Sequence, residues 1–110
     1  MRRGEIWTVA GGPSYAGKPR PSIILQDDPF LDKDSITICG VTTERLDATL
    51  FRVPVVPSEQ NGLREPSDIM ADKVTTVQRH KLGRRIGELH AADLARLEQA
   101  ILTFLGLARR

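Results

Sequence analysis

The stretch Arg20–Gln26 reads RPSIILQ, and after a short acidic segment Ser35–Thr43 reads SITICGVTT. Both runs are rich in β-branched and other apolar residues, which favour strands over helices. Pro21 is compatible with a strand because it stands at one of the strand's first positions. The second run is apolar at most of its positions, which is typical of a strand buried on both faces. These two runs predict a fold that is mainly β.

Three further runs on either side have a similar strand-like composition. They are Glu5–Ala10 (EIWTVA), Phe51–Val56 (FRVPVV) and Asp68–Gln78 (DIMADKVTTVQ). A Gly- and Pro-rich loop at residues 11–19 follows the first run, and Asn61-Gly62 signals a turn before the last one. Pro54 lacks a backbone N–H and cannot donate to a neighbouring strand. Its strand is therefore expected at an edge of the sheet or at a bulge. The last run is expected to break near residues 72–73.

The end of the chain changes to a helical period. Apolar residues recur at the spacing of one helix face, at Leu94, Leu97, Ile101, Phe104, Leu105 and Ala108. Asp93 falls in the first turn, where a negative charge is favourable, and Arg109 and Arg110 lie beyond the last turn. Leu102 and Leu107 lie off this stripe and are either singly exposed or in contact with a partner subunit. Short strands followed by one helix predict a small antiparallel barrel or a strongly bent sheet, with the helix over one end or face.

The chain has the size and composition of one globular domain. Its 110 residues are 40% hydrophobic and 27% charged, so we expect a single domain over residues 1–110. The single cysteine, Cys39, excludes an intrachain disulfide and fits a reducing compartment. No apolar stretch is long enough to span a bilayer, and Met1–Glu5 carries no secretory signal. We therefore expect a cytoplasmic protein with no membrane partner.

Charge is unevenly distributed along the chain, although the net charge is only +2. The segment from Lys73 to Gly87 carries five Lys or Arg residues and no acid, whereas acids gather between Asp27 and Asp34. A basic segment of this kind either attracts a polyanion such as a nucleic acid or forms a solvated face without a partner. Charge alone leaves both interpretations open.

Common catalytic motifs are absent from the sequence. There is no Cys/His cluster with zinc spacing, no Walker loop, and no GxGxxG, GxSxG or HExxH motif. His80 and His90 stand in unrelated contexts, so a two-histidine acid–base site has no support. Cys39 lies in the middle of a predicted strand, which favours a small core residue over a nucleophile.

Four residues remain as candidates for chemistry or binding. Arg20 stands where a Gly/Pro-rich loop meets an apolar strand, and such junctions often hold functional groups. Thr42 and Thr43 end a strand, where a hydroxyl either serves a ligand or is simply solvated. Tyr15 either stacks on a base or anchors its own loop.

These residues resemble those of the MazF/PemK toxin family. The opening Arg3-Gly4-Glu5-Ile6-Trp7 looks like the start of that family, and Arg20–Asp28 (RPSIILQDD) resembles its Arg-Pro strand. Residues 35–42 are similar to its third strand, and residues 68–74 with 79–82 resemble the region before its last segment. Gly87–Leu107 is similar to its closing helix. The resemblance covers nearly the whole chain.

The resemblance implies a fold and a biochemical function. It implies a small SH3-like barrel of the CcdB/PemK type with a C-terminal helix, which acts as a homodimer. It also implies the toxin of a toxin–antitoxin pair, with a cognate antitoxin whose acidic disordered segment binds the toxin. Members of the family cut single-stranded RNA at short sequences without a metal or other cofactor, and leave a 2′,3′-cyclic phosphate and a 5′-hydroxyl. The chain is thus expected to be an endoribonuclease, or mRNA interferase.

The resemblance also assigns residues to roles. The family's essential arginine corresponds to Arg20 and its essential threonine to Thr42, with Thr43 as the adjacent alternative. Contacts with RNA are assigned to Lys18, Tyr15, Thr43, Lys73 and Arg79, and no metal ligand is assigned. The chain departs from the family where many relatives read Gln-Ile-Arg-Thr. Here Lys73 stands for the glutamine and Thr75 for the arginine, which bears on the RNA groove and its recognition sequence.

The chemistry is consistent with the residue types. Cleavage to a cyclic phosphate uses the RNA's own 2′-hydroxyl as the nucleophile, so the protein needs neither a nucleophile nor a metal-bound water. A guanidinium provides a fork of donors for phosphate oxygens, and a threonine hydroxyl can donate to an oxygen of the same group. Two alternatives remain: a CcdB-like gyrase poison of the same fold without enzymatic activity, and a non-catalytic RNA-binding barrel.

Overall fold

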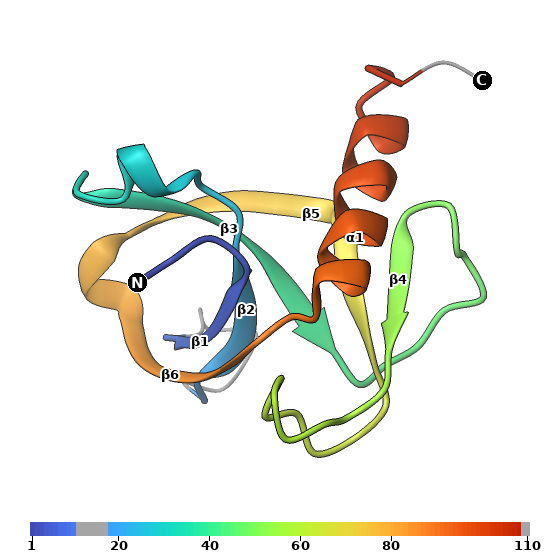
Figure 1. The fold of residues 1–110 in the computed structure, drawn as a ribbon, viewed down its shortest axis with the longest axis horizontal. Coiled ribbons are helices and arrows are strands. Elements are labelled where there is room, and N and C mark those ends of the chain that lie inside the picture. The colour runs from blue at the N-terminus through green and yellow to red at the C-terminus, as the bar shows by residue number, and fades with distance from the viewer. Residues whose placement is uncertain (11–17, 109–110) are drawn as a thin grey trace.

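A computed structural model of the chain describes residues 1–10 and 18–108. Within these residues, six strands and one α-helix follow one another, and all six strands precede the helix (Figure 1). The strands are β1 (Glu5–Val9), β2 (Arg20–Ile24), β3 (Ser35–Thr42), β4 (Arg52–Val55), β5 (Ser67–Gln78) and β6 (Leu82–Glu88), and the helix is α1 (Ala91–Phe104). The short 3-10 helices η2 (Asp28–Phe30) and η3 (Arg79–Lys81) lie between strands. The mainly β fold with a C-terminal helix is confirmed.

The six strands form one antiparallel sheet in the order β4-β5-β3-β2-β1-β6. β2 and β3 lie in the middle of the sheet. The apolar run of β3 predicts burial on both faces, but its residues mostly alternate between buried and half-buried, and consecutive buried residues occur only at Ile38 and Cys39. Neighbouring residues in these strands belong to two different clusters: Ile23 and Cys39 to one, Ile24 and Ile38 to the other. Because successive side chains of a strand point to opposite faces, the sheet has a packed core on each side. Burial on both sides fixes the register of β2 against β3.

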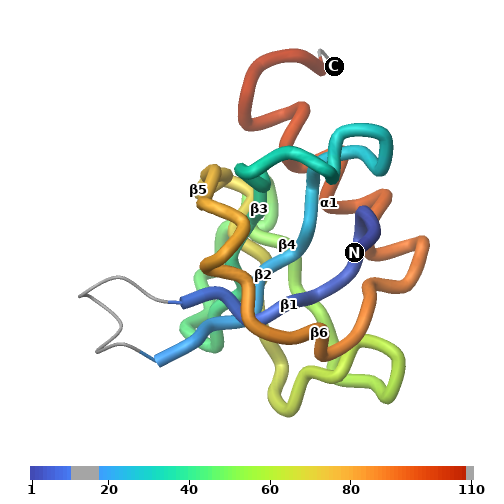
Figure 2. The backbone as a smooth tube through the Cα atoms, turned by 90° about the vertical axis from the view of Figure 1, so that its left-hand side faces the viewer, coloured from blue at the N-terminus to red at the C-terminus, as the bar shows by residue number. Residues whose placement is uncertain are grey.

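The sheet is strongly curved but is not closed into a barrel by strand pairing (Figures 1 and 2). β4 and β6 are its edges among the described residues, and no ladder joins them. The turn that follows β4 lies against β6 instead. The backbone N–H of Glu88 donates to the carbonyl of Gln60 at 2.9 Å, and Gly62 packs directly on Ile86. The predicted bent sheet is therefore confirmed. The predicted barrel is corrected in one respect: among the described residues, the turn after β4 covers the β6 edge, and no β4–β6 ladder closes the sheet.

The predicted break near residues 72–73 does not interrupt β5 itself. It corresponds instead to a change of register in the pairing of β5 with β3. β5 runs without interruption from Ser67 to Gln78. Its pairing with β3, however, changes register between the pairs Cys39↔Val74 and Val41↔Ile69. Residues 70–73 therefore face the single residue Gly40, and this bulge turns the first half of β5 toward β4.

The sequence-based expectations missed β6. Asp93 lies in the first turn of the closing helix as predicted, whereas the resemblance that extended this helix back to Gly87 began it too early. Residues 82–88 form a strand that pairs with β1, and α1 begins only at Ala91. Gly87 in β6 approaches the backbone of residues 60–61 so closely that a Cβ would overlap it. Glycine and exposed arginines replace the alternating apolar residues that identify a strand, and this obscured β6 in the sequence.

α1 packs one side of its first three turns against β4 and β5 (Figure 1). Leu97 and Ala100 are buried, and Leu94 and Ile101 pack on the same core, as the helical period predicts. The stripe ends earlier than expected, because the helix stops at Phe104 and Gly106 has a φ of +73°. Phe104 and Leu105 are about half exposed, so the predicted extension of the stripe to Ala108 is wrong. Within the described residues, α1 is too short to cross a membrane.

Candidate active site

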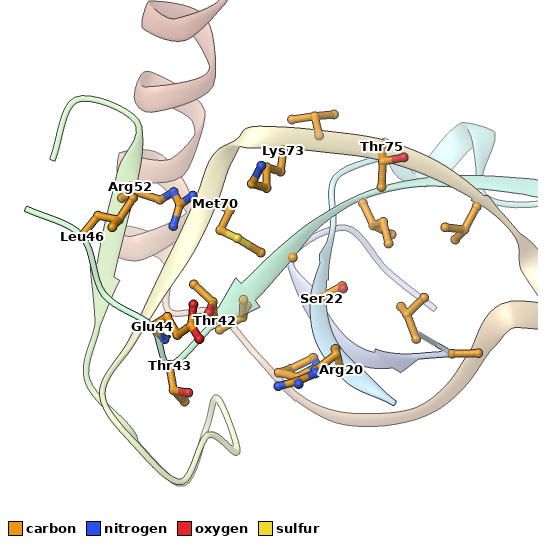
Figure 3. Close-up of a pocket in the computed structure, with 18 residues that line it drawn as sticks. Arg20, Ser22, Thr42, Thr43, Glu44, Leu46, Arg52, Met70, Lys73 and Thr75 are labelled. Atoms are coloured by element: carbon orange, nitrogen blue, oxygen red, sulfur yellow. Dashed lines mark hydrogen bonds between the residues drawn. The ribbon is translucent and has the colours of Figure 1, made fainter. Parts of the chain in front are cut away.

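An open groove with a volume of about 1010 Å³ lies across one face of the sheet, over β2, β3 and β5 (Figure 3). Its polar and charged lining residues come from the ends of these strands and from the loop that follows β3. They are Arg20, Ser22, Thr42, Thr43, Glu44, Arg52, Lys73 and Thr75. The groove therefore collects functional side chains from parts of the sequence that are far apart.

Arg20 and Thr42 lie opposite each other at the ends of neighbouring strands. β2 and β3 pair antiparallel with Ser22 across from Gly40 and Ile23 across from Cys39. Continuing this register by two residues brings Arg20, the first residue of β2, opposite Thr42, the last residue of β3. Both residues line the groove, and Figure 3 shows the Arg20 side chain extending toward the end of β3. A cationic donor and a hydroxyl thus converge on one space.

The groove lies where the pairing of β3 with β5 changes register. Gly40 lies at this shift, and the Met70 side chain reaches across it. A Cβ at Gly40 would come within 2.9 Å of the Met70 Cε, so the absence of a side chain lets Met70 lie over β3. Lys73 and Thr75 follow on the same strand and line the groove, with Lys73 pointing into it (Figure 3).

The end of β3 is fixed by hydrogen bonds. The backbone N–H of Glu44 donates to Thr42 Oγ1 at 3.1 Å, which leaves the threonine's own O–H as a donor. Asp68, only 1% exposed, accepts from Leu46 N at 3.1 Å and from Arg45 Nε at 3.3 Å. A buried carboxylate therefore ties down the loop that carries Thr43 and Glu44.

The cations of the groove differ in how they are held. Arg52 Nε donates to Asp72 Oδ1 at 2.8 Å and its Nη2 donates to Oδ2 at 3.3 Å, so its guanidinium serves a structural pair between β4 and β5. Burial alone would raise the pKa of Asp72, but the hydrogen bonds and charge of Arg52 outweigh it and hold that pKa below its usual value. Lys73 is exposed, and it forms none of the ion pairs found among the described residues.

Cys39 lies beneath the groove and has the properties of a core residue. It is fully buried, and its Sγ donates to the carbonyl of Met70 at 2.9 Å. Burial, together with the charge of Asp72, raises the pKa of its thiol to about 12. The prediction that Cys39 is a core residue is confirmed. Among residues 1–10 and 18–108, no group of three or more His, Cys, Asp and Glu side chains is arranged to hold a metal ion.

The structure brings four of the seven predicted site residues together and separates two. Arg20, Thr42, Thr43 and Lys73 line the groove. Lys18 is exposed just before β2, outside this lining, and Tyr15 lies outside the described residues. Arg79 lies in η3, where its Nε donates to the carbonyl of Lys33 at 3.1 Å, and it does not line the groove.

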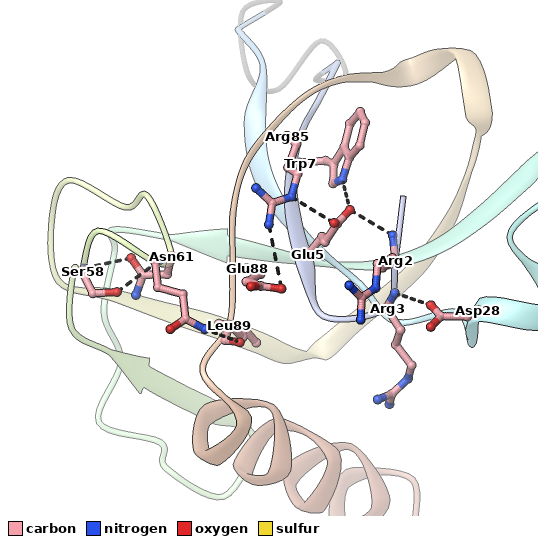
Figure 4. A network of polar contacts seen from close by, with 11 residues as sticks. Arg2, Arg3, Glu5, Trp7, Asp28, Ser58, Asn61, Arg85, Glu88 and Leu89 are labelled. Carbon is pink, nitrogen blue, oxygen red and sulfur yellow. Dashed lines mark hydrogen bonds and ion pairs between the residues drawn. The ribbon is translucent and has the colours of Figure 1, made fainter.

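The basic segment from residue 73 to residue 87 does not form one continuous basic face. Arg85 Nε binds Glu5 Oε2 at 3.0 Å and its Nη2 lies 3.8 Å from Glu88 Oε2 (Figure 4). Burial would raise the pKa of Glu5, yet hydrogen bonds from Trp7 Nε1, the Arg2 backbone and Arg85 bring it below its usual value. Arg85 is therefore committed to the fold, whereas Lys73 faces the groove. This division explains why charge counting alone could not locate a binding surface.

Sequence reasoning missed Glu44 and Asp68. Glu44 lines the groove beside Thr42 (Figure 3), and Asp68 faces Thr42 from β5 while holding the following loop. An acid two residues after a strand-end threonine was a signal within the sequence. Asp68 gave no such signal, because its role depends on hydrogen bonds from Arg45 and Leu46, which are distant from it in the sequence.

Comparison with known proteins decides the family. The sequence profile of the PemK-like, MazF-like toxins of type II toxin–antitoxin systems matches residues 2–105. The chain belongs to this family. The family resemblance noted in the sequence is thereby confirmed.

Individual relatives match this MazF-like chain along nearly its whole length. It is 46% identical over 108 residues to the probable endoribonuclease MazF of Mycolicibacterium smegmatis, covering 98% of this chain and 99% of the relative. It superposes on the Mycobacterium tuberculosis toxin MazF-mt6 with a TM-score of 0.81 and 28% identity, covering 96% of this chain and 99% of the other. It also superposes on a mycobacterial endoribonuclease in complex with its cognate antitoxin, with a TM-score of 0.83, 22% identity, and coverage of 100% and 99%. These MazF-like folds share its curved sheet and C-terminal helix.

Proposed function

We propose that this chain is the endoribonuclease toxin of a type II toxin–antitoxin pair, and that it cleaves single-stranded RNA in the groove that Arg20 and Thr42 line. The observation that carries the proposal is the register of β2 against β3. Continued to the strand ends, it brings the Arg20 guanidinium opposite the Thr42 hydroxyl, and both residues line one groove. The family and the 46% identical relative, a probable endoribonuclease, support it. The products are an RNA with a 2′,3′-cyclic phosphate and an RNA with a 5′-hydroxyl.

Each of the two residues has a defined part in this reaction. The RNA's own 2′-hydroxyl attacks the adjacent phosphorus, so negative charge grows on the nonbridging oxygens as the new bond forms. The Arg20 guanidinium donates to these oxygens in a bidentate manner and stabilises the charge. Thr42 donates its O–H to the same phosphate, because its oxygen already accepts from Glu44 N. The reaction requires no metal ion or other cofactor.

Neighbouring residues of the groove bind the flanking RNA. Thr43 and Lys73 line it and are assigned to RNA contacts. Lys18, in the segment that leads into β2, is assigned to RNA just outside it, and Arg79 to a more distant contact. Tyr15, which lies outside the described residues, is also assigned to an RNA contact. Lys73 and Thr75 both face the groove, so the two departures from the family pattern act on which sequence is recognised.

A cognate antitoxin is the second partner. The family description and a relative solved with its antitoxin support this assignment. An acidic, disordered antitoxin segment that folds over the groove would block Arg20 and neutralise its charge. Its binding weakens as salt is added, because opposite charges are screened. The toxin works as a homodimer in which residues 1–110 form a toxin domain of each subunit, and it acts in the cytoplasm, where its RNA substrates are found.

Mapping the ends of RNA products tests the proposed function. The purified protein is incubated with a long RNA in excess EDTA, and both ends at each cut are identified. Cuts at short defined sequences with cyclic-phosphate and 5′-hydroxyl ends support the proposal. An intact RNA together with trapped DNA gyrase supports the CcdB-like alternative, and binding without either effect supports a non-catalytic RNA-binding protein.

A further inference from the structure

Glu44 is an acidic side chain in a groove whose other charged lining residues are cations. Those cations are Arg20, Arg52 and Lys73. A carboxylate that faces a bound polyanion weakens binding by charge repulsion, so it does not serve affinity for RNA phosphates. When ionised, a carboxylate is purely an acceptor of hydrogen bonds and protons. Its position beside Thr42 therefore points to an accepting role at the reacting phosphate (Figure 3).

The backbone around Glu44 is anchored on both sides. Its own N–H donates to Thr42 Oγ1 at 3.1 Å. Two residues later, the N–H of Leu46 donates to the buried carboxylate of Asp68 at 3.1 Å, and Arg45 pairs with the same carboxylate. A group that transfers protons needs this kind of support, because small errors of position reduce the rate strongly.

The reaction needs a proton acceptor, and among the described residues that line the groove only Glu44 carries a carboxylate. The 2′-hydroxyl must lose its proton as it attacks phosphorus. An arginine side chain, with a pKa above about 12, is already protonated and serves as a donor. The Thr42 hydroxyl is a weak base, and its oxygen already accepts from Glu44 N. The Asp72 carboxylate is held by Arg52.

We propose that Glu44 is the general base of the cleavage reaction, a role that rests on the function proposed above. The Glu44 carboxylate takes the proton of the 2′-hydroxyl while the 2′-oxygen forms its bond to phosphorus. The bond between phosphorus and the 5′-oxygen breaks, and the departing oxygen takes a proton from solvent water. Glu44 then returns its proton to solvent. Arg20 and Thr42 stabilise the phosphate throughout.

The test compares single-turnover cleavage of one RNA by the wild-type protein, Glu44→Gln and Glu59→Gln across a range of pH. Glu59 is an exposed acid outside the groove and provides the matched control. Loss of a general base lowers the rate by on the order of 10²- to 10⁴-fold. The wild-type rate falls as acid protonates the base, whereas Glu44→Gln loses this dependence. Glu44→Asp restores part of the rate together with the acid limb.

RNA binding separates this role from a merely structural one. Glu44→Gln is expected to bind RNA at least as tightly as the wild type, because a charge that repels phosphate has been removed. Its circular dichroism spectrum and unfolding midpoint are expected to match those of Glu59→Gln. A wild-type rate with unchanged pH dependence in Glu44→Gln would overturn the proposal. So would an unchanged rate with a new cleavage sequence, because Glu44 would then be reading a base. If the wild-type protein cleaves no RNA, the proposed function fails as well.

Discussion

Arg20 combines a rigid position with access to the groove. It begins β2, where pairing with Val9 of β1 holds its backbone, while its exposed side chain lines the groove. The side chain offers five N–H donors in a planar fork, which matches the oxygens of a phosphate. This geometry gives arginine an advantage over any other cation at this position.

Replacing Arg20 tests this advantage. Arg20→Ala is expected to lower the single-turnover cleavage rate by on the order of 10²- to 10³-fold, as for other single donors that stabilise a transition state. Arg20→Lys is expected to remain severely impaired, because a point charge does not reproduce the bidentate contact. Both variants should retain the wild-type unfolding midpoint, since the side chain is exposed. Full activity of Arg20→Lys would show that charge alone suffices.

The two adjacent threonines differ in their surroundings. Thr42 is half-buried, ends β3 and accepts a hydrogen bond from Glu44 N, whereas Thr43 is exposed in the loop. Thr42→Ala is therefore expected to lose most of its cleavage, and Thr43→Ala to lose affinity for RNA with a smaller change in rate. Measuring the rate and the RNA dissociation constant of both variants checks this. The reverse pattern would move the active hydroxyl to Thr43.

The candidate site could be predicted from the sequence only in part. Arg20 and Thr42 lie in strands whose sequences resemble those of the family, and the register of these strands then brings the two residues together. Asp68 could not be predicted, because its importance comes from Arg45 and Leu46, which approach it only in the fold. Arg79 carried a suitable charge, but its Nε donates to the Lys33 carbonyl and the residue does not line the groove.

At the level of elements, the strands with alternating or continuous apolar runs were predicted, and β6 was not. β1 to β5 carry the β-branched residues that such patterns detect. β6 forms because it pairs with β1 and contacts the turn at residues 60–62. These tertiary contacts leave no pattern in the local sequence. The end of α1 was predicted too late because Gly106 ends the helix inside an apolar run.

The contact between the 60–62 turn and β6 makes a testable contribution to stability. Gly62 has a φ of +69°, and a Cβ there would overlap the backbone of Ile86. Gly106 has a similar φ of +73° with no atom within 4 Å of such a Cβ. Alanine at either position lowers the free energy of unfolding because it must adopt the left-handed conformation. Only Gly62→Ala lowers it by a further amount, about 1–3 kcal/mol, through overpacking. Urea unfolding followed by circular dichroism, at equal protein concentrations, should show this difference.

The Gly106→Ala variant is the matched control for that comparison. Equal unfolding free energies for the two variants would mean that the turn can move away from β6 without cost. The edge of the sheet would then not depend on this contact.

At the scale of the whole molecule, apolar surface remains exposed beyond what one small domain needs. Leu102, Phe104, Leu105 and Leu107 are exposed around the end of α1. Sedimentation at micromolar concentration is expected to give twice the chain's 12.2 kDa, as the proposed homodimer requires. A species of 12.2 kDa under those conditions would contradict the dimer.

The central claim is that the groove cleaves RNA with the RNA's own 2′-hydroxyl as the nucleophile. The most direct measurement uses a short RNA that contains one cleavage sequence, beside a copy with a single 2′-deoxy sugar immediately 5′ of the scissile phosphate. We expect the wild-type protein to bind both and to cleave only the all-ribose strand, whether or not EDTA is present. Cleavage of the deoxy copy at the normal rate would contradict the account, because the nucleophile would then have to be a water molecule.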